Sequence, residues 1–103
     1  MATNAAVVHS ALPCGLKALL TVLRKLYLQP GGGRKISGLR RGLPNGPVLQ
    51  AVDRVVSVLQ SEGLVYVSGE VVHPVRRCTA RVHQIIAAPA LSSDPIVERL
   101  RDI

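Results

Sequence analysis

The chain has 103 residues and a formal net charge of +7, from 13 Lys and Arg against 6 Asp and Glu. Hydrophobic residues make up 48% and aromatic residues 2%, which predicts one small domain with an aliphatic core rather than a disordered tail. The basic charge indicates an anionic partner, and the few aromatic residues argue against a stacking platform for single-stranded nucleic acid. The longest uncharged stretch, 1–16, is too short and too interrupted for a membrane span, and a signal peptide is not expected.

The polar and sulfur-bearing residues do not form a catalytic or metal-binding pattern. Two cysteines, Cys14 and Cys78, do not make the disulfide framework of a small secreted protein, so we expect a cytoplasmic protein with reduced thiols. The three histidines are too dispersed for a zinc site, and no cofactor is predicted. No nucleophile, base and orienting residue can be assembled, which favours a binding protein over an enzyme.

Residues 1–12 show no clear period and are expected to form an N-terminal arm. From Pro13 to Tyr27, leucines recur at the spacing of one helical face, which predicts a first helix. The segment Pro30-Gly31-Gly32-Gly33 ends it, and Gly31-Gly-Gly-Arg-Lys-Ile-Ser37 is interpreted as a flexible, basic connector. Apolar spacing then predicts a short second helix over 36–43.

A third helix is predicted over about 47–62, because a valine stripe recurs at helical spacing and Gly63 provides the stop. Two short strands, 64–67 and 70–73, follow and are joined by a turn at Ser68-Gly69. Together with the helices already described, they predict an α+β protein, mainly α with a small β-hairpin.

Helical spacing returns from Val75 to about Ala88 and predicts a fourth helix. Asp94 and Pro95 then have the types expected at the N-cap and first position of a short C-terminal helix. The predicted order is helix–helix–helix–hairpin–helix, with a domain over 13–90 and a C-terminal segment over 91–103.

This order of elements resembles the winged helix-turn-helix domain of bacterial and archaeal transcription regulators. The resemblance covers residues 16–88 and is carried by Ile36-Ser-Gly-Leu-Arg-Arg-Gly-Leu-Pro44 and Val55-Val-Ser-Val-Leu-Gln-Ser-Glu-Gly-Leu-Val65. It implies a transcription regulator or chromatin-associated protein that binds double-stranded DNA, with the third helix in the major groove.

Mapped onto this chain, the resemblance implies base contacts at or near the third helix and phosphate contacts before it. Gln50 can pair with adenine through two hydrogen bonds, and Arg54 can pair with guanine or with a phosphate. The candidate base contacts are Asn45, Gln50, Arg54 and Ser57, and the candidate phosphate contacts are Arg34, Lys35, Arg40 and Arg41. A solvated helix surface is the alternative explanation of the same residues.

Two observations leave other functions open. The predicted turn Ser68-Gly69-Glu70 carries no cation, whereas the wing of a DNA-binding winged helix normally carries Arg or Lys. The segments Arg24-Lys-Leu-Tyr-Leu28 and Val71-Val-His-Pro74 also resemble a winged-helix protein of the small ribosomal subunit. Binding of ribosomal RNA and docking of a protein are therefore the alternatives to DNA binding.

The aliphatic residues near the C-terminus exceed what a three-helix core of this size needs. Regulators of this family pair so that two recognition helices meet successive major grooves. We therefore expect a homodimer, with Ile85, Ile86, Ile96 and Leu100 at the subunit interface or its edge.

Overall fold

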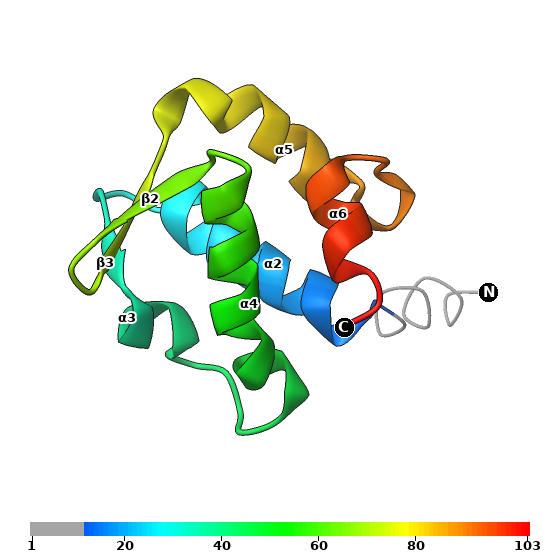
Figure 1. Ribbon diagram of the computed structural model, residues 1–103, viewed down its shortest axis with the longest axis horizontal. Coiled ribbons are helices and arrows are strands. Elements are labelled where there is room, and N and C mark those ends of the chain that lie inside the picture. Colours follow the sequence, from blue (N-terminus) through cyan, green and yellow to red (C-terminus); the bar gives the residue numbers. More distant parts are fainter. Residues whose placement is uncertain (1–11) are drawn as a thin grey trace.

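The computed structural model describes residues 12–103, so the arm expected over 1–12 lies, apart from Leu12, outside the described residues (Figure 1). The described part contains five α-helices and a three-stranded antiparallel sheet, which confirms the α+β class. One strand of this sheet was not predicted.

The first helix runs through the middle of the molecule. It consists of α2 (Cys14–Leu23) and a π-helical continuation, η1 (Arg24–Leu28), and its regularly spaced leucines are buried against α4 and the sheet. At its end, the hydroxyl oxygen of Tyr27 lies 2.6 Å from the carbonyl oxygen of Leu64 and 3.0 Å from that of Val75. Leu64 precedes and Val75 follows the hairpin, so this one hydroxyl links the helix to both ends of the hairpin.

The next two helices are α3 (Ile36–Arg40) and α4 (Pro47–Ser61). α3 is shorter than predicted, because the ammonium group of Lys25 donates hydrogen bonds to its last carbonyl groups and the chain becomes extended at Arg41. α4 matches the prediction within one residue. Gly63 follows it with a φ of +78°, a left-handed conformation that favours glycine at the end of a helix.

The sheet contains β1 (Arg34–Lys35), β2 (Val65–Ser68) and β3 (Val71–Pro74) in the order β1–β3–β2. The hairpin lies one residue further along the chain than predicted, since Ser68 pairs with Val71 and the turn is Gly69-Glu70. β1 occupies part of the segment interpreted as a flexible connector, and that interpretation is wrong for Arg34 and Lys35. Pairing with β3, more than thirty residues away, holds them in a strand.

The C-terminal third contains α5 (Thr79–Ala87) and α6 (Pro95–Leu100), with a 3-10 turn before each, η2 (Arg76–Cys78) and η3 (Pro89–Leu91). The predicted fourth helix began too early, because Val75 is extended and the first turn is 3-10. Asp94 is confirmed as the N-cap of α6, where its side chain accepts a hydrogen bond from the backbone N–H of Ile96.

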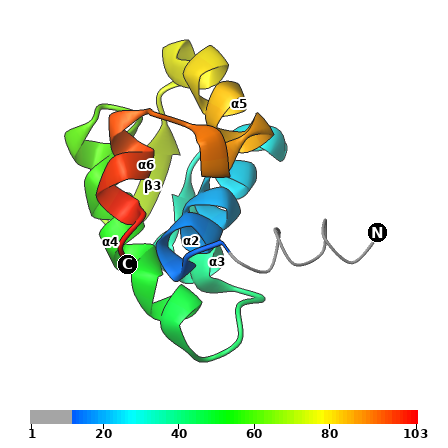
Figure 2. The same cartoon turned by 90° about the vertical axis from the view of Figure 1, so that its right-hand side faces the viewer.

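Three of the four residues expected at a subunit interface are inside the core of this chain. Ile85, Ile96 and Leu100 are at most 1% exposed, so the expectation that they meet a second subunit is wrong. Ile86 is partly buried and packs against the same core. Ile96 and Leu100 belong to α6, which packs against α2 and α4 (Figure 2), and Ile85 belongs to α5, which packs against α2. The C-terminal segment thus completes the core of the domain.

Candidate nucleic-acid interface

The exposed face of α4 presents one row of polar side chains. Gln50, Asp53, Arg54 and Ser57 are all exposed and recur at intervals of three or four residues, which places them on one side of the helix. On the other side, Leu59 and four valines are buried: Val52, Val55, Val56 and Val58. The exposed positions of the three predicted residues are therefore confirmed, while their contacts with bases stay a prediction. Asp53 was not among the predicted contacts, although the same helical spacing places it in this row.

Asp53 forms an ion pair with Arg40 and so joins α4 to α3. The two side chains are 64% and 40% exposed, so the pair contributes little to stability. Arg40 is one of the candidate phosphate contacts, and that contact stays a prediction. The ion pair was not predicted, since the partner lies 13 residues along the chain and only the packing of α3 on α4 brings it close.

Arg34 lies against η1. Its Nε donates to the carbonyl oxygen of Lys25 at 3.0 Å, and its Nη2 donates to Oε1 of Gln29 at 3.0 Å. Burial lowers the pKa of Lys25, and the positive charges of Arg34 and Arg41 lower it further, so these three cations are close to one another. Arg34 therefore has a structural role at the end of the first helix. These bonds use two of the five N–H groups of its guanidinium, and its phosphate contact stays a prediction.

Lys35 lies beside α4 at a shallow pocket between the hairpin turn and α3. The pocket has a volume of about 490 Å³ and also contains Arg40, Asp53 and Glu70 among its lining residues. Two cations and two carboxylates therefore meet there. The hairpin turn contributes only Gly69 and Glu70 to this pocket, so it adds a negative charge there and no cation.

The first turns of α4 are bordered by the two ends of the described chain. Gln50 and Arg54 line a pocket of about 370 Å³ together with Cys14 at the start of α2 and Ile103. Asn45 and Arg41 are exposed in the segment between α3 and α4. Within residues 12–103, neither Arg41 nor Arg54 takes part in an ion pair, so both guanidinium groups can meet an anion.

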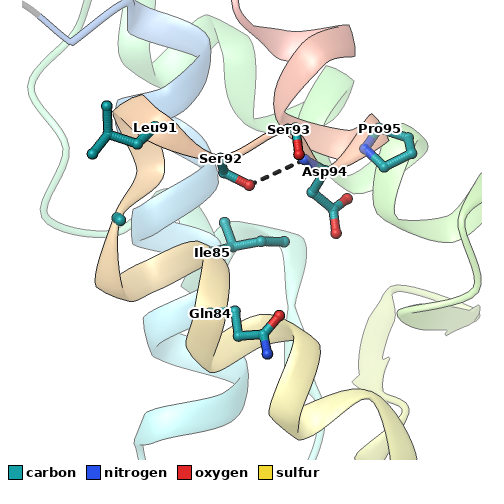
Figure 3. Close-up of a pocket in the computed structure, with 8 residues that line it drawn as sticks. Gln84, Ile85, Leu91, Ser92, Ser93, Asp94 and Pro95 are labelled. Atoms are coloured by element: carbon teal, nitrogen blue, oxygen red, sulfur yellow. Dashed lines mark hydrogen bonds between the residues drawn. The ribbon is translucent and has the colours of Figure 1, made fainter.

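A further pocket, of about 500 Å³, lies between α5 and the loop that leads to α6 (Figure 3). Asp94 is the one charged residue among those that line it. Its carboxylate is already bound to Arg81 and to the backbone N–H of Ile96. This pocket therefore presents no free charged group to a ligand.

Two other kinds of site find no support in the described part of the chain. Residues 12–103 contain no group of three or more His, Cys, Asp or Glu side chains placed to hold a metal ion. No helix in this range combines the length and the hydropathy needed to cross a membrane. Comparison of the chain with protein-family models, with curated proteins and with solved structures finds no match in any of the three.

Proposed function

We propose that this chain is a winged helix-turn-helix domain that binds double-stranded DNA through α4. The helices α2, α3 and α4 followed by the β2–β3 hairpin have the order of elements on which the sequence resemblance rests. α3 and α4 are joined by a short segment, 41–46, and pack against each other, as the two helices of a helix-turn-helix do. The third strand, β1, extends the hairpin into a small sheet beside α3 (Figure 1).

The observation that carries the proposal is the exposed polar row of α4 with unpaired cations beside it. An α-helix fits the major groove of DNA, where Gln and Arg side chains can read base edges. Gln50 and Arg54 lie one turn apart in the first half of α4. Arg41 precedes α4, and Lys35 lies at the pocket shared with α3, so both can contact the phosphates on either side of the groove.

The ion pair between Arg40 and Asp53 makes one part of this surface electrically neutral. A bare carboxylate in the row would repel phosphates, and Arg40 offsets this repulsion. The positive charge that remains comes from Arg41 and Arg54, because Glu70 lines the same pocket as Lys35. The proposal does not require a dimer, because one α4 can occupy one stretch of major groove.

The test is a titration of the protein with duplex DNA and, in parallel, with an RNA hairpin, each at two salt concentrations. We expect the double variant Arg41→Ala/Arg54→Ala to bind duplex more weakly and to lower the slope of log K against log[salt] by about two units. Arg24→Ala/Arg77→Ala, which removes two exposed cations from η1 and η2, is the matched control and should retain the parent slope. An equal loss in this control, or tighter binding of the RNA hairpin that does not depend on Arg41 and Arg54, would contradict the proposal.

Base recognition is tested separately with Gln50→Ala and Arg54→Ala. Loss of a paired base contact costs about 1–3 kcal/mol at a preferred sequence and little on random DNA, whereas loss of a phosphate contact weakens both equally. We expect Gln50→Ala to reduce the difference in affinity between a duplex selected from a random pool and an unselected duplex. If selection produces no common motif and neither substitution changes binding, α4 is not the recognition helix.

A further inference from the structure

Two aromatic rings stack on the hairpin. Tyr66 of β2 and His73 of β3 lie directly opposite each other in the sheet, with ring centroids 4.7 Å apart and ring planes inclined by 14°. Tyr66 is 55% exposed, although large hydrophobic residues are usually buried. The low content of aromatic residues did not indicate this pair, because its second ring is a histidine on the neighbouring strand.

These rings lie on the outer face of the sheet, away from the core. Their neighbours along the strands, Val65 and Val72, are buried, and side chains alternate between the two faces of a strand. On β3, His73 and Val71 therefore share the outer face. Lys35 of β1 pairs with Val71 and shares that face as well.

Gly33 allows β1 to approach the rings closely. A Cβ atom at this position would lie 2.6 Å from Nδ1 of His73 and 2.6 Å from Cγ1 of Val71, too near for any side chain. The backbone of Gly33 thus lies against the edge of the imidazole ring. The last glycine of the Gly31-Gly32-Gly33 run has a packing role that its position in a connector did not indicate.

We propose that the outer face of the sheet binds an unpaired nucleobase, which stacks on Tyr66 and whose phosphate meets Lys35. An exposed aromatic ring can stack on any base, and a nearby cation attracts the phosphate that follows it. The net charge of +7 favours nucleic acid over an apolar protein segment as the occupant. Lys35 is shared with the proposed duplex interface, but Tyr66 and His73 are not part of the exposed row of α4. Stacking on Tyr66 therefore does not depend on α4 reading duplex DNA.

The protein is suited to a direct optical test, because it has two tyrosines and no tryptophan. Tyr27 is buried, with its hydroxyl group near two backbone carbonyl oxygens, so a change in tyrosine emission on binding reports on Tyr66. The probe is an oligothymidylate of about eight nucleotides, within the length that one small single-strand site covers. We expect saturable quenching of the emission, with the affinity measured independently by anisotropy of a labelled oligonucleotide.

Two variants separate stacking from charge attraction. Tyr66→Val removes the ring but keeps a residue that favours strands. It should weaken oligonucleotide binding by about 5- to 160-fold, the range expected for loss of one stacked base. Tyr66→Phe keeps the ring and should bind as the parent protein does. Circular dichroism melting shows whether each variant is folded.

Arg54→Ala separates this proposal from the one on duplex binding. It should leave oligothymidylate binding unchanged, even if it alters the affinity for duplex. If the parent shows no quenching, or if Tyr66→Val binds as tightly as the parent while Lys35→Ala does not, the rings are not a base-stacking site. The first of these outcomes would mean that no base stacks on Tyr66, and the second that binding depends on charge attraction alone.

Discussion

The guanidinium group of Arg81 donates two hydrogen bonds to the carboxylate of Asp94, 2.8 Å from Nε to Oδ2 and 2.9 Å from Nη2 to Oδ1. Nη2 of Arg81 also lies 3.1 Å from the carboxylate of Glu62, directly after α4. One side chain of α5 thus joins the end of α4 to the start of α6. These contacts hold the C-terminal segment against the helices whose core it completes.

This pairing predicts a pH-dependent part of the stability. Hydrogen bonds from Arg81 lower the pKa of Asp94 below its usual range, although burial acts in the opposite direction. Because the pKa is lower in the folded state, the stabilisation is complete above about pH 5 and is lost as the pH falls through the folded-state pKa. We expect Asp94→Asn, which retains an N-cap residue, to lower the free energy of unfolding by about 1 kcal/mol at neutral pH.

Urea unfolding between neutral and acidic pH measures this effect. The difference between the parent and Asp94→Asn should shrink below about pH 4, where the unfolded-state carboxyl group is protonated. Asp102→Asn removes an exposed carboxylate from the same segment and should change the unfolding free energy by less than about 0.5 kcal/mol. A difference in unfolding free energy that stays constant down to the lowest pH would mean that the charge of Asp94 does not stabilise the folded protein.

The buried C-terminal residues predict a loss of stability rather than a loss of association. Leu100 has no exposed surface, whereas Leu91 is 88% exposed. We expect Leu100→Ala to lower the free energy of unfolding by about 2–5 kcal/mol and Leu91→Ala by less than about 0.5 kcal/mol. Urea unfolding and sedimentation velocity together test this. A Leu100→Ala protein of unchanged stability that sediments as a smaller species than the parent would restore the interface hypothesis.

A pair of glycines provides a test of close packing. A Cβ atom at Gly15 would overlap the carbonyl oxygen of Leu100, where α2 and the end of α6 meet. We expect Gly15→Ala to cost about 1–3 kcal/mol, since backbone atoms must separate to admit the methyl group. Gly38 lies within α3 with no atom within 4 Å of an added Cβ, so Gly38→Ala should stabilise the protein by about 0.5–1 kcal/mol. Thermal unfolding of both variants measures the contrast, and equal effects would argue against the docking of α6.

Asp53 predicts a gain of function under the proposed duplex binding. Asp53→Asn removes a negative charge from the exposed row of α4 and releases Arg40 to contact a phosphate. We expect tighter duplex binding, with the slope of log K against log[salt] steeper by about one unit. Glu98→Gln, which removes the carboxylate paired with Arg101 on α6, serves as the charge-matched control and should have little effect. Weaker binding by Asp53→Asn would instead mean that the carboxylate contacts the DNA, for example at a cytosine.

The sequence alone determined most of the helices. The spacing of the leucines before Tyr27 and of the valines after Pro47 indicated two helices. The buried face of a helix consists of residues three or four positions apart, so a short stretch of sequence is enough to recognise it. Asp94 and Pro95 marked the start of α6, since an N-cap acts within its own first turn. The exposure of Gln50 and Arg54 followed from the same periodicity.

Only the tertiary structure decided which of these local features meet. β1 is two residues long and becomes a strand through β3. Arg40 meets Asp53, Tyr66 stacks on His73, and Leu100 enters the core rather than a subunit interface. Each of these outcomes depends on atoms that are distant in the sequence or on the direction in which a helix packs. Local periodicity distinguishes a buried face from an exposed one, but it does not specify what covers the buried face, because that depends on how the whole chain packs.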